Sequence, residues 1–261
     1  MSKLKERLGK WLQLPEMEQF DLDDPGLTEQ RKQIILGKPF LKKIYIDWYN
    51  EIKNRLAGVP KGKIVEIGSG AGFFKQIMPE VITSDIMPLS STDITFSAEE
   101  MPFADAELSG ITMVDVLHHI PHAKLFFKEA VRTLKPGGKI VMVEPSNSAW
   151  GRFIFSNFHH EPWNPLGDWE LPSSGPLSGA NGALPWIIFV RDRKLFEQEF
   201  PELKITYMRQ HTPLRYLLSG GVSLKAMVPA WSSGFFILLE KLTSPISNAF
   251  AMFQTIEITR K

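Results

Sequence analysis

Residues 65–72 read Val-Glu-Ile-Gly-Ser-Gly-Ala-Gly, and this stretch decides the fold of the chain. Lys63 and the β-branched pair Ile64 and Val65 lead into the acidic Glu66. Three glycines follow at every second position, Gly68, Gly70 and Gly72. Because glycine allows a sharp turn and a close approach to the main chain, the pattern predicts a ligand-binding turn from a strand into a helix.

Single positions in the loop exclude two common phosphate-binding motifs. A dinucleotide fingerprint would have its third glycine at position 73, where this chain has Phe73. A P-loop would end in Gly-Lys-Ser/Thr, and this loop does not. The loop is therefore suited to a nucleoside that carries no phosphate.

A second acidic residue agrees with a nucleoside ligand. Residues 81–85 predict a strand that ends at Asp85, 19 residues after Glu66. In an open α/β sheet this spacing places a carboxylate at the carboxyl end of the neighbouring strand, where it can accept both ribose hydroxyl hydrogens. Ile86 and Met87 follow directly and offer the base an apolar face.

With these residues the chain resembles the class I S-adenosylmethionine-dependent methyltransferases. The similar branch includes the quinone-biosynthesis C-methyltransferases and many small-molecule O- and N-methyltransferases. Four more segments carry the resemblance, which covers roughly residues 40–145: Ser-Ala-Glu-Glu-Met-Pro-Phe at 97–103, Val-Asp-Val-Leu-His-His-Ile at 114–120, Leu-Lys-Pro-Gly-Gly at 134–138 and Val-Glu-Pro at 143–145.

The resemblance implies an α/β fold: a Rossmann-like, doubly wound sheet of seven strands, mostly parallel, with the last strand antiparallel and helical cap insertions. It implies S-adenosyl-L-methionine as cofactor. The cofactor-binding residues that it implies, together with the loop and strand-end residues above, are Glu66, Gly68, Ser69, Gly70, Gly72, Asp85, Ile86, Ser97, Ala98, Glu99, Asp115 and His118.

Ser97 departs from the family pattern, which usually has an Asp against the adenine amino group. A hydroxyl still accepts that hydrogen bond, but without charge the bond is weaker, so we expect modest cofactor affinity. The alternative is a relative that keeps the fold and no longer binds the cofactor.

Composition sets wider bounds. The 261 residues fit one elaborated α/β domain, or a domain with a cap, and the net charge of +1 provides no field that would attract nucleic acid. The chain has no cysteine, which excludes disulfides and thiolate metal sites and fits a cytoplasmic protein. We expect no signal peptide and no transmembrane segment, because no apolar run approaches about 20 residues.

The chain divides into residues 1–57 and a methyltransferase domain at 58–261. Residues 1–14 form a basic amphipathic pattern, which predicts a helix that either contacts an anionic membrane surface or packs on its own domain. A linker at 15–25 and a helix at 28–57 follow, with Tyr45 and Tyr49 as candidate lid residues.

Within the domain at 58–261 we expect alternating strands and helices. The expected strands are 63–67, 81–85, 93–97, 110–115, 138–144, 203–209 and 249–259, and the expected helices are 71–78, 122–134 and 191–199.

Two insertions interrupt the domain at 146–185 and 213–246. The first leaves the carboxyl end of the fifth strand, where ligands bind in such sheets, and is too long for an ordinary connection. We expect both to cap the site and to present apolar faces to the acceptor from Trp150, Trp163, Trp169 and Trp186. The alternative is a solvent-exposed insertion.

Histidines supply the candidate general bases. Methyl transfer is an in-line displacement that depends on positioning, and histidine is the natural base near neutral pH. Five histidines, His118, His119, His122, His159 and His160, fall in loops at the expected active edge. We expect catalysis from His159, His160 or His119, although a structural hydrogen bond is the alternative for the pair His118 and His119.

Binding of a metal ion is the alternative role for these histidines. His160 and Glu161 with His118 or His119 would form a nitrogen–oxygen site. Since the spacing repeats no known zinc pattern, we expect no metal.

The sequence therefore predicts methyl transfer from S-adenosylmethionine to a small molecule, at oxygen, nitrogen or an activated carbon. One form of this prediction is an apolar or lipid-linked acceptor that the protein meets through peripheral membrane contact. The alternative is a cofactor-binding or interaction protein of the same fold without catalysis. A protein or RNA substrate fits poorly, since Glu-Pro-Ser stands at 144–146 in place of an Asn/Asp-Pro-Pro-Tyr motif and the sequence has no basic stripe.

Overall fold

The computed structural model describes residues 14, 21, 23–159, 161–171, 175, 177–243, 245 and 247–261. The amphipathic helix expected at 1–14, most of the linker at 15–25 and His160 lie outside these residues.

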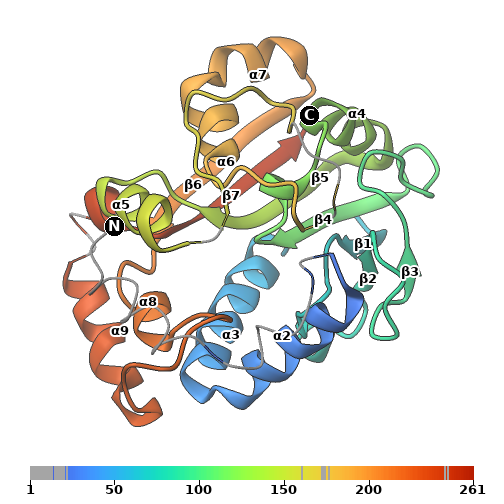
Figure 1. Ribbon diagram of the computed structural model, residues 1–261. Helices are drawn as coiled ribbons and strands as arrows, with labels where there is room; N and C mark the ends of the chain where they lie inside the picture. The colour runs from blue at the N-terminus through green and yellow to red at the C-terminus, as the bar shows by residue number, and fades with distance from the viewer. Residues whose placement is uncertain are drawn as a thin grey trace.

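Seven strands form one sheet (Figure 1). The strands are β1 (Lys63–Glu66), β2 (Ile82–Asp85), β3 (Ile94–Thr95), β4 (Leu108–Val114), β5 (Leu134–Pro145), β6 (Leu203–His211) and β7 (Phe253–Arg260). Their order is β3-β2-β1-β4-β5-β7-β6, and β7 runs antiparallel to both β5 and β6. The other pairs are parallel, so the predicted doubly wound sheet with one antiparallel strand is confirmed. The chain crosses from β3 back to β4 beside β1, which makes the β1/β4 edge the switch point of the sheet.

Helices cover both faces of the sheet (Figure 1). Before β1 come α2 (Pro25–Gly37) and α3 (Pro39–Arg55). Between the strands lie the short turns η2 (Phe74–Gln76) and η3 (Leu117–His119), then α4 (Ala123–Thr133), α5 (Ala149–Phe158), α6 (Leu184–Trp186), the π-helical turn η4 (Ile187–Arg191) and α7 (Arg193–Glu199). Between β6 and β7 lie α8 (Arg215–Ser219), η5 (Ala230–Ser232), α9 (Ser233–Leu242) and α10 (Ser247–Phe250).

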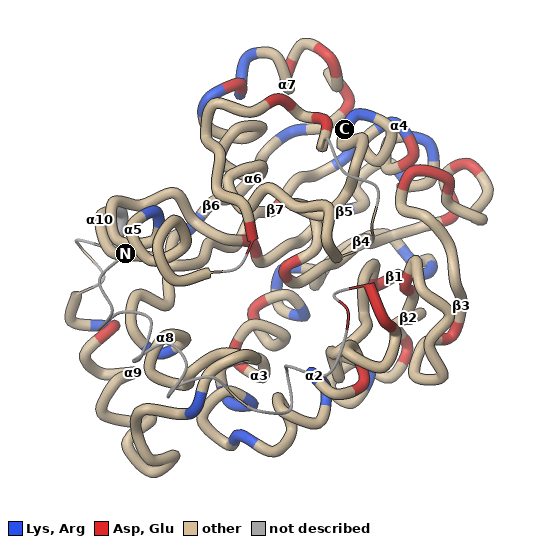
Figure 2. Tube along the Cα trace, viewed as in Figure 1, with Lys and Arg blue, Asp and Glu red and all other residues tan. Residues whose placement is uncertain are grey.

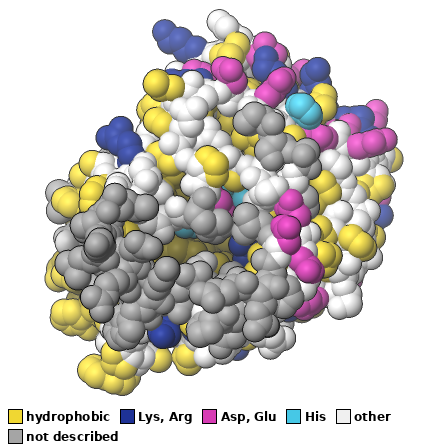
Figure 3. Space-filling model, in the orientation of Figure 1, with side chains coloured by type: hydrophobic (Ala, Val, Ile, Leu, Met, Phe, Trp, Pro, Cys, Tyr) yellow, Lys and Arg dark blue, Asp and Glu magenta, His cyan; other side chains and the backbone are white. Residues whose placement is uncertain are grey.

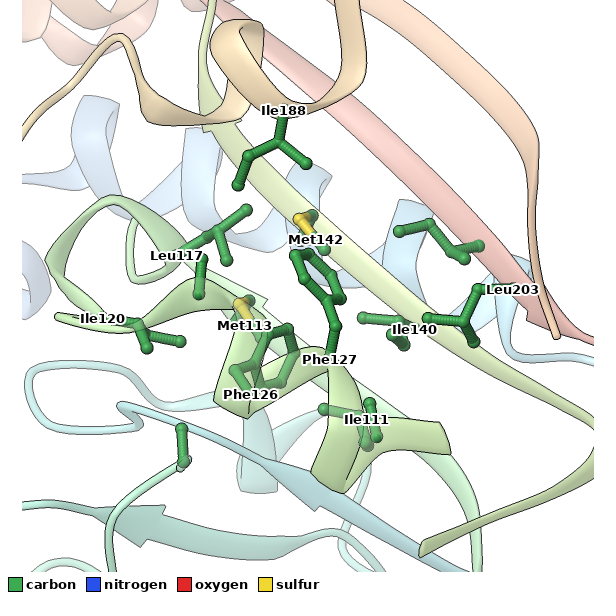
Figure 4. Close-up of a cluster of buried hydrophobic side chains, with 14 of the residues drawn as sticks. Ile111, Met113, Leu117, Ile120, Phe126, Phe127, Ile140, Met142, Ile188 and Leu203 are labelled. Carbon is green, nitrogen blue, oxygen red and sulfur yellow. The ribbon is translucent and has the colours of Figure 1, made fainter. Parts of the chain in front are cut away.

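The interior strand β5 shows how the two layers form. Successive side chains of a strand point to opposite faces. Ile140 and Met142 pack with α4, η4 and α7, whereas Val141 and Val143 pack with α3 and α5. Figure 4 shows the first of these clusters, where Phe126 and Phe127 of α4 meet side chains of β4 and β5.

Two expected helices differ from the structure. The helix expected at 28–57 is divided, because Pro39 forces Lys38 into an extended conformation and a new helix starts there. The helix expected at 71–78 is wrong, since only the single turn η2 forms. Only six residues separate Gly72 from Pro79, and proline cannot donate the hydrogen bonds that would extend a helix.

Charged residues of the two signs are not segregated along the described part of the chain. Lys and Arg are interspersed with Asp and Glu along the trace (Figure 2). None of the helices that the structure describes has the length and hydrophobicity needed to cross a membrane.

Candidate active site

A cavity of about 300 Å³ lies at the carboxyl ends of β1, β2 and β4. Figure 3 shows a hollow on this face with hydrophobic, acidic and histidine side chains at its wall. Every cofactor-binding residue predicted from the sequence except His118 lines the cavity: Glu66, Gly68, Ser69, Gly70, Gly72, Asp85, Ile86, Ser97, Ala98, Glu99 and Asp115.

The glycine loop is shaped by close contacts that only glycine permits. Gly68 has a φ of 63°, and a Cβ there would lie 2.5 Å from Cγ2 of Val116. A Cβ on Gly70 would lie 3.0 Å from Oδ2 of Asp85. The Gly70 N–H donates to that oxygen at 3.1 Å, so the loop after β1 is tied to the end of β2. The loop therefore brings main chain and carboxylate to the same wall.

Glu66 ends β1 as a buried acid with an unused oxygen. Its side chain is 3% exposed, and Oε2 has no hydrogen-bond partner among the described residues. Burial raises the pKa of Glu66 to about 8, although a hydrogen bond from Ser69 works against the shift. Lys32 also lowers this pKa by its charge, but Oε2 meets no donor among the described residues, and a donor or a positive charge from a ligand would satisfy it.

Asp85 ends β2 and is held by the main chain on both oxygens. Oδ1 accepts the Met87 N–H at 3.0 Å, and Oδ2 accepts the Gly70 N–H. Burial raises the pKa of Asp85, while these backbone hydrogen bonds lower it. Ile86, which follows, is 51% exposed, as expected of a side chain that offers an apolar face to a ligand.

Ser97 and its neighbours form the β3 side of the cavity. The Ser97 hydroxyl accepts the Glu99 N–H at 3.2 Å, while the Glu99 carboxylate accepts the His122 N–H at 2.7 Å. These bonds fix the segment after β3 without using up the lone pairs of the Ser97 hydroxyl.

Asp115 follows β4 with a φ of 63°, which is uncommon for a residue other than glycine. Its N–H donates to the Val143 carbonyl at 2.8 Å, so the turn is held by β5. Burial raises the pKa of Asp115 to about 6, against the lowering effect of His118. Acids from three adjacent strand ends, Glu66, Asp85 and Asp115, thus face one cavity.

The N-terminal helices supply a wall that the sequence reasoning largely missed. Tyr45 and Tyr49 of α3, expected as lid residues, line the cavity together with Thr28, Arg31 and Ile35 of α2. The Arg31 Nε is buried and has no hydrogen-bond partner among the described residues. The positions 28, 31 and 35 lie on one helical face, and an arginine on that otherwise uncharged face was the available signal.

The insertions contribute Gly175, Leu177, Tyr216 and Val222 to the same cavity. The four tryptophans expected there do not line it. Trp169 and Trp186 pack with the α4 and α7 side of the core, and Trp169 donates to Asp192 Oδ2 at 2.9 Å. Trp150 donates to the Pro213 carbonyl at 3.0 Å, and Trp163 stacks on Phe155 with ring centroids 4.9 Å apart. The four tryptophans therefore pack against other parts of the protein, and the aromatic side chains that line the cavity are Tyr45, Tyr49, Phe96 and Tyr216.

His118 is a buried partner of carboxylates and not a wall of the cavity. Its side chain is 0% exposed, and Nδ1 lies 2.7 Å from Oε2 of Glu144. Nε2 lies 3.3 Å from Oε2 of Glu161 and 3.9 Å from Oδ1 of Asp115. Burial works to lower the pKa of His118, but the carboxylates of Glu144 and Glu161 outweigh it and hold the pKa well above its ordinary value. His118, which was expected to contact the cofactor, therefore does not line the cavity. It lies buried behind the cavity wall, where it pairs with carboxylates.

The other histidines separate into distinct environments. His119 lines the main cavity, and its Nε2 lies 3.5 Å from Oε1 of Glu161. His159 borders a second cavity of about 10 Å³, together with Glu161 and Trp163, and its Nδ1 accepts the Glu161 N–H at 3.4 Å. His122 is exposed and lines neither cavity.

Comparison with known proteins agrees with the geometry. A methyltransferase domain family matches residues 65–142. A demethylmenaquinone methyltransferase of Symbiobacterium thermophilum is 27% identical over 118 residues, which cover 44% of this chain and 46% of that relative. The ubiquinone/menaquinone biosynthesis C-methyltransferase UbiE of Brucella anthropi is 42% identical over 48 residues, 18% of each chain. The chain thus spans less than half the length of either relative.

A solved structure shares the fold over most of its length. The crystal structure of an S-adenosylmethionine-dependent methyltransferase from Thermotoga maritima aligns with a TM-score of 0.50 and 19% identity, covering 83% of this chain and 89% of that chain. The glycine loop, the acids at the ends of β1, β2 and β4, and the matched domain lead to one conclusion. The chain has the fold of S-adenosylmethionine-dependent methyltransferases, and its residues 65–142 match a methyltransferase domain family.

Proposed function

We propose that this protein transfers a methyl group from S-adenosylmethionine to a small-molecule acceptor. The observation that carries the proposal is the buried carboxylate of Glu66, whose Oε2 borders the 300 Å³ cavity without a hydrogen-bond partner among the described residues. An unpaired buried carboxylate is costly, so the site favours a ligand that brings a donor or a positive charge. The amino group and the sulfonium of S-adenosylmethionine provide both.

The walls of the cavity suit the remaining parts of that cofactor. Asp85 would accept the ribose hydroxyls, Ile86 would cover one face of the adenine, and the Ser97 hydroxyl would accept from its amino group. The Gly68 and Gly70 main chain would lie against the methionine portion. When bound, the cofactor supplies a methyl group made electrophilic by the adjacent sulfonium.

The acceptor would occupy the part of the cavity formed by Arg31, Tyr45, Leu177 and Tyr216. We propose that the N-terminal helices and the insertions at 146–185 and 213–246 act together as a cap that excludes water. Support comes from these four residues, which belong to three separate segments and line one cavity with the glycine loop. The aromatic and aliphatic side chains favour an acceptor with apolar parts, and Arg31 favours one that also carries a negative charge or an acceptor oxygen.

The chain's part in the reaction is to align the acceptor and to take up its proton. As the bond from the acceptor to the methyl carbon forms, the bond from that carbon to sulfur breaks. The acceptor loses its proton to a base on the protein. We propose His119 for this role, because it lines the main cavity while His159 borders only the small one. His160, also expected from the sequence, lies outside the described residues.

Calorimetry with S-adenosylmethionine and with its demethylated product, followed by turnover assays against phenolic, quinol, amine and isoprenoid acceptors, tests the proposal. We expect binding of both nucleosides and release of the demethylated product with at least one acceptor class. Absence of nucleoside binding would contradict the proposal. Binding without turnover of any acceptor would instead support the alternative, a cofactor-binding protein that has lost catalysis.

A further inference from the structure

A group of carboxylates and imidazoles meets between the two cavities, and we call it the histidine–carboxylate cluster: Asp115, His118, His119, Glu144 and Glu161. These residues come from η3, the turn between β4 and η3, the end of β5 and the first insertion. The donor atoms of His118, His119 and Glu161 all lie within 4.8 Å of one another. The cluster therefore gathers two imidazole nitrogens and a carboxylate at one point.

The hydrogen bonds of the cluster determine which nitrogen of each ring faces inward. Glu144 accepts the N–H groups of Val116 and Leu117 on Oε1, so its Oε2 is an acceptor for Nδ1 of His118 at 2.7 Å. His119 places Nδ1 3.1 Å from the Gly179 carbonyl oxygen, which can only accept. Both rings thus carry a proton on Nδ1, and both direct Nε2 toward Glu161.

This arrangement needs a cation, which in the metal-free protein is a second proton on His118, since, against the effect of burial, Glu144 and Glu161 hold the pKa of that ring above its ordinary value. In the neutral rings Nε2 bears a lone pair, and each lone pair faces an oxygen of the Glu161 carboxylate. Two acceptors do not attract each other, so a proton or a cation is needed between them. The Nε2 of His118 is fully buried and has no hydrogen-bond partner among the described residues. A cation at this point would satisfy it and would neutralise Glu161.

The distances between the Nε2 atoms and the Glu161 oxygens help to distinguish a proton from a metal ion at this point. Hydrogen bonds from N–H to oxygen span about 2.7–3.2 Å. The separations of 3.3 Å and 3.5 Å between Nε2 and the Glu161 oxygens are longer. Two ligand atoms that each lie about 2.0–2.1 Å from a tetrahedral ion are about 3.3–3.4 Å apart. The observed spacing is therefore close to that of ligands around a metal ion and slightly long for direct hydrogen bonds.

The surroundings of the cluster also match a metal site. Imidazoles that bind metals usually donate their other N–H to a carboxylate or a carbonyl, as His118 and His119 do. Two nitrogen ligands and one carboxylate suit Zn²⁺ and leave one position open. Glu161 and Asp115 also border the 10 Å³ cavity, which has room for about one water molecule.

We infer that His118, His119 and Glu161 form a binding site for a divalent transition-metal ion of the zinc class. Glu144 and the Gly179 carbonyl orient the two imidazoles, and Asp115 stands beside the open position. The sequence offers Glu161 with His118 or His119 as candidate ligands but predicts no metal, because the spacing repeats no zinc pattern. The inferred site differs from that expectation because the structure brings the three side chains together. It rests on its ligands alone and does not depend on methyl transfer. With the ion on Nε2 and a proton on Nδ1, His119 has no nitrogen free to take the acceptor's proton, so the role of base proposed above applies to the metal-free protein.

Metal titration of the purified full chain tests the inference without an activity assay. After treatment with a chelator, the protein is titrated with Zn²⁺ in competition with a chromogenic chelator, and with Co²⁺ as a spectroscopic probe. We expect one equivalent of Zn²⁺ to bind and Co²⁺ to give the visible absorption of a tetrahedral site. Glu161→Gln and His119→Asn should each weaken Zn²⁺ binding by at least about 100-fold.

His122→Asn is the matched control, because His122 is a nearby histidine on the exposed surface and takes part in no cluster contact. It should leave the Zn²⁺ affinity unchanged. Since the buried His118 can be needed for folding, the argument relies on the Glu161 and His119 variants, with circular dichroism to confirm their fold. Equal Zn²⁺ affinity in all four proteins, or no binding by the wild type, would overturn the inference and assign the missing charge to a proton on His118.

Discussion

At the scale of single residues, the site is defined by acids that the fold places at strand ends. Glu66 and Asp85 are both buried, but their hydrogen bonding differs. Asp85 accepts two backbone N–H groups, whereas one oxygen of Glu66 meets no donor among the residues described. Asp85 therefore shapes the glycine loop, whereas Glu66 keeps one oxygen that a ligand could satisfy.

Glu66 gives a prediction about pH and stability. Its pKa is about 8 in the folded protein against an ordinary 4.5, so between these values the folded state keeps a proton that the unfolded chain has released. The free energy of unfolding of the cofactor-free protein should then fall as pH rises from 4.5 to 8. Glu66→Gln cannot titrate and should lack this part of the decrease.

Urea unfolding of wild type and Glu66→Gln at several pH values measures the difference directly, because other titrating groups cancel between the two proteins. The variant should become relatively more stable toward pH 8 and the gap should level off above it. Parallel pH curves would show that Glu66 is ionised at its ordinary pKa.

Asp85 gives a prediction about cofactor affinity. Asp85→Ala removes the acceptor for the ribose hydroxyls and should weaken S-adenosylmethionine binding by about 1.5–3 kcal/mol, the range for hydrogen bonds to a charged group. Asp85→Asn keeps one acceptor oxygen and should lose less. Calorimetry on both variants checks this order, and affinity that is unchanged in Asp85→Ala would contradict the assigned role.

At the scale of elements, α3 supports the glycine loop from outside the sheet. The Phe73 N–H donates to the Tyr49 hydroxyl at 3.2 Å, and the Tyr49 ring stacks on Phe74 with centroids 4.9 Å apart. The turn η2 after the loop has only three residues, which is too short for a helical turn to be stable without packing against other elements. An N-terminal helix thus takes over part of the support that the expected helix at 71–78 would have provided.

Tyr49→Phe tests this support. The variant keeps the ring and leaves the Phe73 N–H buried without its partner, which should cost about 1–3 kcal/mol of the free energy of unfolding. Tyr45→Phe is the control, because the Tyr45 hydroxyl makes no hydrogen bond to the described residues. Urea denaturation compares the two variants, and equal losses would show that the Phe73 contact does not support the loop.

At the scale of the whole molecule, an ion-pair bridge joins segments that are far apart in the sequence. Arg215 of α8 contacts Oδ2 of Asp47 in α3 and Oε2 of Glu240 in α9, each at 2.6 Å. Glu240 also accepts the N–H groups of Leu214 and Arg215. The bridge connects the second insertion to the N-terminal helices beside Tyr216, where both line the cavity.

Arg215→Met should destabilise the protein by about 1.5–3 kcal/mol, because Glu240 is only 9% exposed and would lose its cationic partner. The control is Arg193→Met, whose ion pair with Glu197 is about half exposed and lies within one helix. Its loss should stay below about 1 kcal/mol. Thermal and urea unfolding measure both, and similar losses in the two variants would contradict a structural bridge.

Local patterns in the sequence determined the sheet and the cofactor side of the site. The pattern is a strand that ends in an acid, then a glycine loop, then a second strand that ends in an acid 19 residues after the first. It depends on short-range geometry, and the positions of Glu66, Gly68, Gly70 and Asp85 follow from it. The antiparallel last strand was predicted from the resemblance and from the alternation of its residues, and it is present. These features need little information from the rest of the chain.

Tertiary packing decided the remainder. Burial of apolar surface is not directional, so the large aromatic side chains expected at the cavity could be buried elsewhere. Trp169 and Trp186 pack against the core, and tyrosines and Phe96 line the cavity in their place. Arg31 reached the cavity only through the docking of α2, and Glu161 met His118 and His119 only through the folding back of the insertion. Such contacts join residues dozens of positions apart, and no local spacing records them.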